Sequence, residues 1–525
     1  MAPTVAVIGL GAVGLVTLKN LLEEGFDATG LERNDYLGGL WRFTEKPTIS
    51  VLKSTCSNGS KQRGCFTDFP YPSDAPDFVP AEQVHEYLLA YARHFHLEKH
   101  ARLKTSVSSA AWDEKRRKWR LLVTKPESTG PVEEFFDKVV FAMGSDQQPI
   151  MPEIPGIEKF AGFTSHSVSF KDPNLLAGKR VMILGFGNTA ADMATEVSKC
   201  ASKVYLAHRN GAIILPRWVN EQPVDHVRTY RKYCILQLMS RYTPSLWTST
   251  MNSVIKKLQH QVFDMNPEWR FEPAPSIINQ RPLVSDDLVD KLAAGTIVST
   301  YGLERVLDAS TVETSDGKQY EVDAIIFCTG FSVDFSVVGD ADPTRATTKA
   351  WEETSGSNGR ALPRLYQNIF SLDHPDSLAF MGYLSFMNPA FFMFDLASMA
   401  VAQLWKGNSA FPPQAEMERQ VDQHHAWVCS LAATGSVMPA IVKASDWMDW
   451  VSDVAGTNLE TYLGYGFAGW SFWFSDRRFC SWLMDGLLSP HMYRLFPGKR
   501  KSWAGARDAI IAMNEDRTAR FGPMA

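Results

Sequence analysis

Two short glycine-rich segments of this 525-residue chain have the residue types and spacing that hold a dinucleotide pyrophosphate. The first contains Gly9, Gly11 and Gly14, and the second contains Gly185 and Gly187, with Ala190 at its third position. In such loops the first glycine permits a tight turn, the second lets the backbone approach the phosphates, and the third small residue lets the helix pack on the strand. Two loops in series predict two nucleotides that meet at one active site.

The residues around the first loop predict the elements that must position it. Val5 to Ile8 is an apolar run typical of a buried strand, and residues 13–22 repeat with helical spacing before Gly25. A second strand, Ala28 to Leu31, leads into Glu32. An acid there binds a ribose 2′-hydroxyl, which suits a nucleotide without a 2′-phosphate, either FAD or NAD.

The second loop has the same frame but a different ending. Arg180 to Leu184 predicts a buried strand, Asn188 to about Cys200 a helix, and Val204 to Ala207 the next strand, which ends in His208 and Arg209. A guanidinium at this position can clamp a 2′-phosphate, although a solvated surface charge is the alternative. The simplest assignment is FAD at the first loop and NADPH at the second.

Composition excludes several other classes of protein. The net charge of −5 and the lack of a polybasic segment argue against a nucleic-acid partner. The seven cysteines include no Cys-x-x-Cys pair, which argues against a disulfide scaffold, a metal site and a dithiol redox centre.

No apolar window reaches the roughly 18 residues that a spanning helix needs. The longest candidates are residues 381–394 and 462–474. Because the chain enters a strand almost at once, no signal peptide is expected, and a cytoplasmic location follows, with peripheral membrane contact left open.

A further motif lies between the two loops. Phe160, Gly162, His166 and Phe170 form the pattern Phe-x-Gly-x-x-x-His-x-x-x-Phe. This motif, placed between two glycine fingerprints, resembles the identifying sequence of the flavin-containing monooxygenases, the class B flavoprotein oxygenases. Other segments also resemble this family, and they are residues 38–41, 57–72, 322–331 and 489–507.

The resemblance implies an α/β fold with two Rossmann-like dinucleotide-binding domains and additional helical segments. An FAD domain, residues 1–155, is interrupted by an NADPH domain, residues 156–328, which carries a helical insertion at about 211–290. The chain then returns to the FAD domain and a C-terminal helical region, residues 329–525. The insertion is expected either to cover the active site or to be a surface excursion with no catalytic role.

The resemblance also assigns residues. Asn58 is expected beside the flavin as the catalytic-site residue, although Ser-Asn-Gly-Ser is equally the chemistry of a turn. His166 is expected to connect the linker to the NADPH domain, with a catalytic base as the alternative. The expected cofactor-binding residues are Gly9, Gly11, Gly14, Glu32, Gly39, Leu40, Trp41, Val107, Gly185, Gly187, Asn188, Thr189, Arg209, Thr329 and Gly330.

The chemistry implied by the resemblance belongs mainly to the cofactor. NADPH reduces FAD, O₂ adds to form a flavin hydroperoxide, and one oxygen atom passes to a nitrogen or sulfur of a small, largely apolar molecule. The alternatives are a Baeyer–Villiger monooxygenase acting on a ketone and a non-catalytic two-nucleotide flavoprotein. In Baeyer–Villiger enzymes the linker motif normally ends in Trp followed by Pro or Asp, whereas here Phe170 and Lys171 favour nitrogen or sulfur oxygenation.

Some positions depart from the family pattern. Met143 replaces a threonine and Phe331 replaces a tyrosine, while Ala397 and Met399 stand where many animal-type members have Gln and Arg. The loss of that polar pair is expected to open or dry part of the cavity. The sequence leaves open the substrate and whether the protein forms a homodimer.

Overall fold

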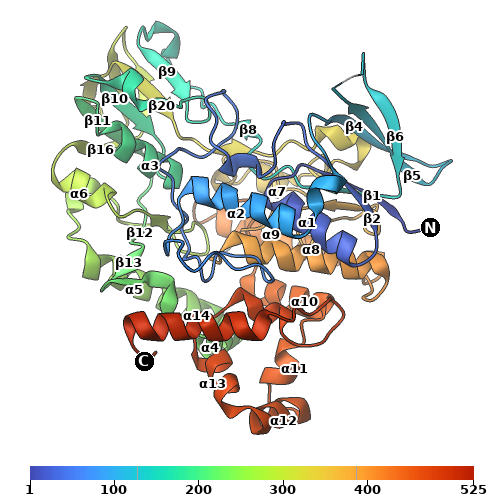
Figure 1. The fold of residues 1–525 in the computed structure, drawn as a ribbon. Coiled ribbons are helices and arrows are strands. Elements are labelled where there is room, and N and C mark those ends of the chain that lie inside the picture. The colour runs from blue at the N-terminus through green and yellow to red at the C-terminus, as the bar shows by residue number, and fades with distance from the viewer. Residues whose placement is uncertain (127, 386, 525) are drawn as a thin grey trace.

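The chain folds around two largely parallel β-sheets with helices on their faces (Figure 1). The computed structural model describes residues 1–126, 128–385 and 387–524. The first sheet has the order β22-β23-β24-β7-β1-β2-β3, and the second has the order β16-β11-β10-β20-β9. The predicted α/β fold class is confirmed.

The first sheet is built from segments at both ends of the sequence. Its parallel strands are β1 (Thr4–Ile8), β2 (Asp27–Leu31), β3 (Ala101–Arg102), β7 (Lys138–Phe141) and β24 (Leu378–Phe380). The antiparallel strands β22 (Leu365–Tyr366) and β23 (Phe370–Ser371) complete one edge. Strand β1 lies between β2 and β7, and its central side chains are fully buried, as its apolar sequence requires.

Helices α1 (Ala12–Glu23) and α8 (Ala390–Lys406) pack against each other, although more than 360 residues separate them. Helix α8 is buried along almost its whole length, and α10 (Ala444–Ala455) covers it from the other side. These helices belong to the largest hydrophobic core of the protein, so the C-terminal region supports the first glycine loop.

The second sheet is entirely parallel. It consists of β9 (Phe163–His166), β10 (Arg180–Leu184), β11 (Lys203–His208), β16 (Ile297–Tyr301) and β20 (Ala324–Phe327). Helices α3 (Asn188–Val197) and α6 (Leu288–Ala293) cover it. The linker motif supplies the edge strand β9, and the helix predicted to reach Cys200 ends three residues earlier, at Val197.

The two connections between the sheets pair with each other. Strand β8 (Gln148–Pro149) leaves the first sheet, and β21 (Phe331–Ser332) returns from the second, and the two are antiparallel. The Thr329 hydroxyl donates to the carbonyl of Ile150, and the Ile150 amide donates to Gly330 at 3.0 Å. Two of the expected cofactor residues, Thr329 and Gly330, therefore lie on this paired crossover.

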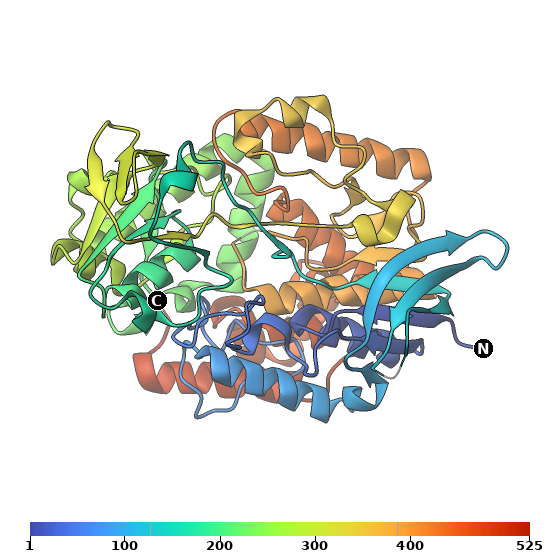
Figure 2. The same cartoon turned by 90° about the horizontal axis from the view of Figure 1, so that it is seen from above.

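Two small antiparallel sheets flank the nucleotide sheets. The first, β4 (Ser106–Asp113), β5 (Lys118–Thr124) and β6 (Val132–Phe136), projects near the N-terminus in both views (Figures 1 and 2). The second consists of β17 (Leu303–Val306), β18 (Thr311–Thr314) and β19 (Gln319–Glu321). Helix α2 (Ala81–His94) contacts α1.

The segment expected as a helical insertion holds two helices, α4 (Tyr230–Tyr242) and α5 (Pro244–Val262). Short strand pairs accompany them: β12 (Ile214–Leu215) with β15 (Leu283–Val284), and β13 (Trp218–Val219) with β14 (Gln222–Pro223). Helix α4 packs against α10 and α13, so the insertion reaches the C-terminal helices. The remaining helices are α7 (Lys349–Glu352), α9 (Gln414–Ala432), α11 (Leu459–Leu463), α12 (Phe467–Ser475), α13 (Arg477–Asp485) and α14 (Ala506–Phe521).

The two long apolar stretches of the sequence belong to separate elements. Helix α8 begins within the first, at Ala390, and the second divides into α11 and α12; Phe386, in the first, lies outside the described residues. Among the helices that the structure describes, none is both long and apolar enough to cross a bilayer.

Candidate active site between the two nucleotide folds

The first glycine loop is too tight for any side chain at two of its three positions. Gly9 has a φ of +92°, and a Cβ atom there would lie 2.8 Å from the carbonyl oxygen of Ala142. A Cβ atom at Gly14 would lie 1.8 Å from the carbonyl oxygen of Gly9. The loop therefore makes the turn and the helix–strand contact that the fingerprint predicts.

The segment expected on the flavin side touches this loop directly. Gly39 has a φ of +58°, and a Cβ atom there would lie 2.9 Å from the Cα of Gly11. The carbonyl of Leu40 accepts a hydrogen bond from Val51 at 2.9 Å. The Trp41 ring meets Phe391, in the first turn of α8, edge to face at 6.1 Å. Backbone from two segments and the start of α8 are thereby brought together.

Glu32 lies at the end of β2 beside the same loop and is only 4% exposed. One carboxylate oxygen accepts from the Leu10 amide at 2.8 Å, and the other accepts from the Asn34 amide at 2.8 Å. The Leu10-bonded oxygen retains a lone pair for a ligand hydroxyl. The Thr105 amide donates to the Glu32 carbonyl at 2.8 Å. This bond holds the start of the segment that carries the half-buried Val107, on β4, near the end of β2.

The second glycine loop is tight at its first position and open at its second. Gly185 has a φ of +125°, and a Cβ atom there would lie 2.2 Å from the carbonyl oxygen of Cys328. At Gly187, in contrast, a Cβ atom would meet no described atom within 4 Å. Thr189 is exposed, and the Asn188 side chain accepts from the Val284 amide at 2.8 Å. Open space at the start of α3 suits a pyrophosphate, because the first backbone amides of a helix have no partner within the helix.

Two guanidinium groups lie at the ends of β11 and β16. Arg209 is exposed and has no hydrogen-bond or ion-pair partner among the described residues. Its side chain passes close to Gly302, where an added Cβ atom would lie 2.9 Å from the Cγ of Arg209. The Arg270 guanidinium stacks 3.6 Å from the ring centre of Tyr301, which is the register partner of His208. Sequence reasoning missed Arg270 because no motif links it to the loop.

Asn58 is exposed and is held by an arginine from the insertion. Its side-chain oxygen accepts from Arg217 at 3.1 Å, and Arg217 also donates to the Ser57 carbonyl at 3.1 Å. Asp286 fixes the other end of Arg217 at 3.0 Å. Because the amide oxygen is engaged, the Asn58 NH₂ group remains available to donate to a ligand.

The same insertion grips the Asn58 loop further along. The Ser60 amide donates to Asp225 at 2.9 Å, and His226 contacts Gln62 at 3.2 Å. A Cβ at Gly59 would lie 3.3 Å from the ring of Pro389, the residue that precedes α8. The insertion thus fixes the Asn58 loop against the start of α8. From the sequence, Arg217 and Asp225 are expected only to lie in the helical insertion at about 211–290, with no role assigned to either.

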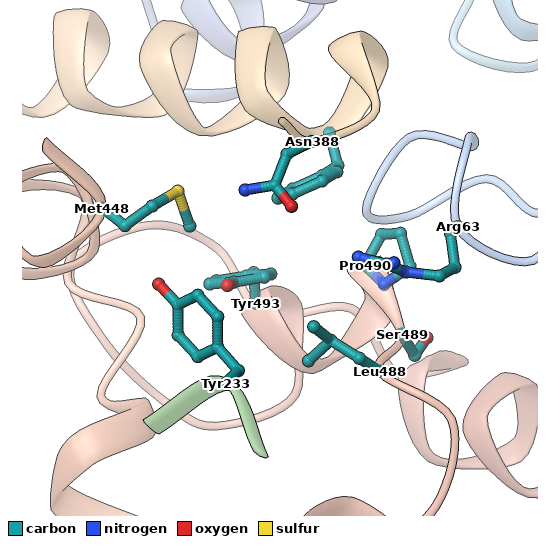
Figure 3. Close-up of a pocket in the computed structure, with 9 residues that line it drawn as sticks. Arg63, Tyr233, Asn388, Met448, Leu488, Ser489, Pro490 and Tyr493 are labelled. Carbon is teal, nitrogen blue, oxygen red and sulfur yellow. The ribbon is translucent and has the colours of Figure 1, made fainter. Parts of the chain in front are cut away.

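A small, mostly apolar cavity of about 10 Å³, room for about one water molecule, lies beneath the start of α8. In Figure 3 the side chains of Asn388, Tyr233 and Tyr493 surround a common space, with Arg63 to one side. Burial raises the pKa of both tyrosines, so they remain neutral phenols, and it lowers the pKa of Arg63 to about 10. The other lining residues are Phe392, Met448, Leu488, Ser489 and Pro490.

A second small cavity, also of about 10 Å³, lies at the carboxyl ends of β7 and β24. Met143, Gly144 and Met381 line it, next to the Ala142 carbonyl that abuts Gly9. In parallel sheets ligands bind beyond the carboxyl ends of strands. The family departure at Met143 therefore lies beside the first nucleotide loop.

Three other sequence expectations are placed by the structure. His166 accepts from the Val168 amide at 3.2 Å, packs its ring 5.1 Å from Phe331, and has a pKa lowered by burial. Ala397 and Met399 are buried in the hydrophobic core, and both cavities described above are lined by other residues. Of the two outcomes expected from this polar loss, an opened or a drier region, the buried apolar packing of Ala397 and Met399 fits the second.

Comparison with known proteins identifies the family. Residues 2–522 match the model of the family described as "Flavin-binding monooxygenase-like". Monooxygenase aurF of Gibberella zeae is 68% identical over 523 residues, covering 99% of each chain. Human flavin-containing monooxygenase 5 is 30% identical, covering 97% of this chain and 92% of its own. The chain belongs to the flavin-binding monooxygenase-like family.

Solved structures agree in fold. S-allyl-L-cysteine S-oxygenase from Allium sativum aligns with a TM-score of 0.63 at 20% identity, covering 99% of both chains. Cyclohexanone monooxygenase from Rhodococcus sp. Phi1, bound to NADP⁺, aligns with a TM-score of 0.59 at 17% identity, covering 86% of this chain and 98% of its own. The protein is a flavin-dependent monooxygenase, and its cofactors are FAD and NADPH, which are characteristic of the family.

Proposed function

We propose that this enzyme uses NADPH and O₂ to oxygenate a nitrogen or sulfur atom of a small, largely apolar molecule. The observation that carries the proposal is the meeting of three parts at one place: the Gly39–Trp41 segment, the start of α8, and Asn58 held by Arg217. These parts come from both nucleotide folds. A hydride donor and its acceptor must meet at such a junction.

The residues of the first loop fit FAD, because backbone approaches closely and Glu32 is ready to accept from a ribose hydroxyl. The residues of the second loop fit NADPH, because Gly187 faces open space and Arg209 is a free cation. Bound FAD would supply the redox chemistry, taking a hydride from NADPH and passing one oxygen atom of O₂ to the substrate.

The protein's own contribution is positioning and exclusion of water. The Asn58 NH₂ group would donate a hydrogen bond toward the reacting centre, and Arg217 would hold its orientation. The small cavity beneath α8 would have to widen to admit a substrate, and its neutral tyrosines and apolar walls would favour an uncharged one. A soft nucleophile requires no acid–base pair for its oxygenation. This agrees with the lining of the cavity beneath α8, in which Arg63 is the charged side chain.

The second candidate is a Baeyer–Villiger reaction on a ketone. The fold does not choose between them, because it is shared with both an S-oxygenase and a cyclohexanone monooxygenase. The end of the linker favours the first candidate: Phe170 is buried in the core of the second sheet, and the Lys171 amine donates to the Ser50 hydroxyl at 2.8 Å. We place the enzyme in the cytoplasm, and its seven cysteines are unpaired thiols.

The test is a substrate panel with the purified yellow protein. NADPH oxidation and product formation are measured with a thioether, a tertiary amine and a cyclic ketone. The proposal predicts a sulfoxide or an N-oxide. A lactone from the ketone, without sulfide or amine oxidation, would support the second candidate. A colourless protein without NADPH turnover would overturn both.

A further inference from the structure

An aromatic surface lies at the tip of the molecule that is farthest from the two nucleotide sheets (Figure 1). It consists of Tyr465, Phe467, Trp470 and Phe474, which are 89%, 91%, 48% and 69% exposed. The last three are spaced three and four residues apart on α12, so they share one face of this helix. We call these four residues the α12 surface.

The helix that carries the α12 surface is packed against the rest of the protein. On the inner side of the same helix, Phe472 packs 5.2 Å from Phe496, and Phe496 stacks 4.4 Å from Tyr462 of α11. Helix α12 also contacts α11 and α13. The helix is therefore anchored by one aromatic side chain while it presents three others to the outside. Grouped exposed apolar residues of this kind mark a binding surface.

Two exposed arginines lie next to the α12 surface. Arg477 and Arg478 follow the helix directly, are exposed, and lie 4.1 Å and 4.9 Å from the ring centres of Trp473 and Trp482. The carboxylates on the same segment are neutralised, Asp476 by Arg507 and Asp485 by Arg231. Within residues 475–485, the charges that have no ion-pair partner among the described residues are therefore cationic, and Glu460 on α11 is the exposed acidic group of the neighbouring helix.

We propose that the α12 surface docks on a lipid bilayer that contains anionic headgroups. Phe side chains would enter the acyl boundary, Trp and Tyr would lie at the headgroup level, and the two arginines would contact lipid phosphates and carboxylates. A second copy of this chain fits less well, because a two-fold contact through α12 would bring the arginines of both copies together. The proposal does not depend on which atom the enzyme oxygenates.

The test is sedimentation of the full-length, FAD-loaded protein with vesicles. Vesicles of pure phosphatidylcholine are compared with vesicles that also contain phosphatidylserine. The proposal predicts binding that is stronger on the anionic vesicles and that falls at least tenfold in the triple variant Phe467→Ser, Trp470→Ser, Phe474→Ser. The double variant Arg477→Glu, Arg478→Glu should lose the preference for phosphatidylserine while retaining the aromatic contact.

The matched control is Val132→Ser, Met151→Ser, Leu175→Ser, which removes three exposed apolar side chains elsewhere and should bind vesicles like the unaltered protein. Flavin absorbance and NADPH oxidation report the fold of each variant. The proposal is overturned if the unaltered protein binds neither vesicle, or if the triple variant binds as well as the unaltered protein. A dimer in solution that the triple variant dissolves, without vesicle binding, would assign the surface to self-association instead.

Discussion

The two glycine loops share a sequence pattern but differ in how much of the protein surrounds them. The first is enclosed: Gly11 abuts Gly39, and Glu32 is 4% exposed with both oxygens hydrogen-bonded. The second is open: Gly187 has no described atom near its missing side chain, and Arg209 is free. We infer that the first holds a nucleotide that stays, whereas the second holds one that is exchanged in each turnover.

The helices behind the loops differ in the same way. Helix α1 is fixed by a buried ionic network: Lys19 pairs with Asp68 and, at 3.0 Å, with Glu23, and Arg494 reaches Glu23 at 2.7 Å. The pKa of Asp68 is lowered by Arg494 and Lys19 against the opposing effect of burial. Among the described residues no comparable network reaches helix α3, which carries Asp192, whose pKa burial raises to about 6. The ionic network behind α1 suits a cofactor that stays bound. The lack of such a network behind α3 is compatible with a cofactor that is exchanged.

The largest effect is expected from breaking the network behind α1. Arg494→Met leaves Lys19 to balance Glu23 and Asp68 and removes the guanidinium that faces the buried Asp395, which should lower the free energy of unfolding by about 3–5 kcal/mol. Chemical denaturation of the FAD-loaded protein measures this. The control is Arg345→Met, which breaks an exposed pair with Asp340 and should cost less than about 1 kcal/mol. Equal losses would show that the buried network does not distinguish the two halves.

Glycine substitutions at the third position of the first loop and at the second position of the second loop test the two local environments. In Gly14→Ala the new Cβ would lie 1.8 Å from a carbonyl oxygen, so backbone must move at a cost of about 3 kcal/mol, and FAD should be lost. In Gly187→Ala the space is empty, so the protein should fold and keep FAD but bind NADP⁺ more weakly. The ratio of protein to flavin absorbance and a titration with NADP⁺ give the two results. Equal loss of FAD in both variants would contradict the comparison.

Arg209→Gln sharpens the assignment of the second nucleotide. Loss of a charge-assisted contact to the 2′-phosphate should weaken binding by about 1.5–3 kcal/mol, or roughly 10- to 100-fold. Calorimetry with 2′,5′-ADP and with 5′-AMP measures it, since only the former carries the phosphate. Arg270→Gln should act in the same direction. If both ligands weaken equally, Arg209 does not read the phosphate.

Arg217→Met tests the link between the halves at Asn58. Because Asn58 would lose its fixed orientation, kcat should fall about tenfold, equivalent to roughly 1.4 kcal/mol, while NADP⁺ affinity changes little. Arg217→Lys should restore part of the rate. A change confined to KM would indicate that Arg217 acts only in binding.

The smallest effect concerns Asp192. The pKa of Asp192 is about 6 in the folded state, above its unfolded value. Between about pH 4 and 6 the folded state therefore binds a proton that the unfolded state does not. The free energy of unfolding consequently rises as the pH falls through 6. Asp192→Asn should stabilise the protein by about 1 kcal/mol at pH 7.5, a value discounted for partial exposure, and by nothing near pH 4. Denaturation at the two pH values checks this, and a pH-independent gain would refute it.

Local patterns in the sequence predicted the nucleotide frames because each frame is formed by residues close together in the chain. Strand β10 has the predicted bounds, and Glu32 lies where the spacing puts it. The contacts that build the site could not be predicted in this way. Arg217 is 159 residues from Asn58, and Arg494 is more than 470 residues from Glu23. Such pairs depend on tertiary packing, which no local spacing encodes.

The central claim is that two unlike nucleotide sites serve one oxygenation, and isotope labelling tests it most directly. The FAD-loaded enzyme is supplied with NADPH, ¹⁸O₂ and a thioether or tertiary amine, and the product is analysed by mass spectrometry. The account predicts one ¹⁸O atom in each molecule of sulfoxide or N-oxide. NADPH oxidation that yields only hydrogen peroxide, with no labelled product from the thioether, the amine or a ketone, would contradict it.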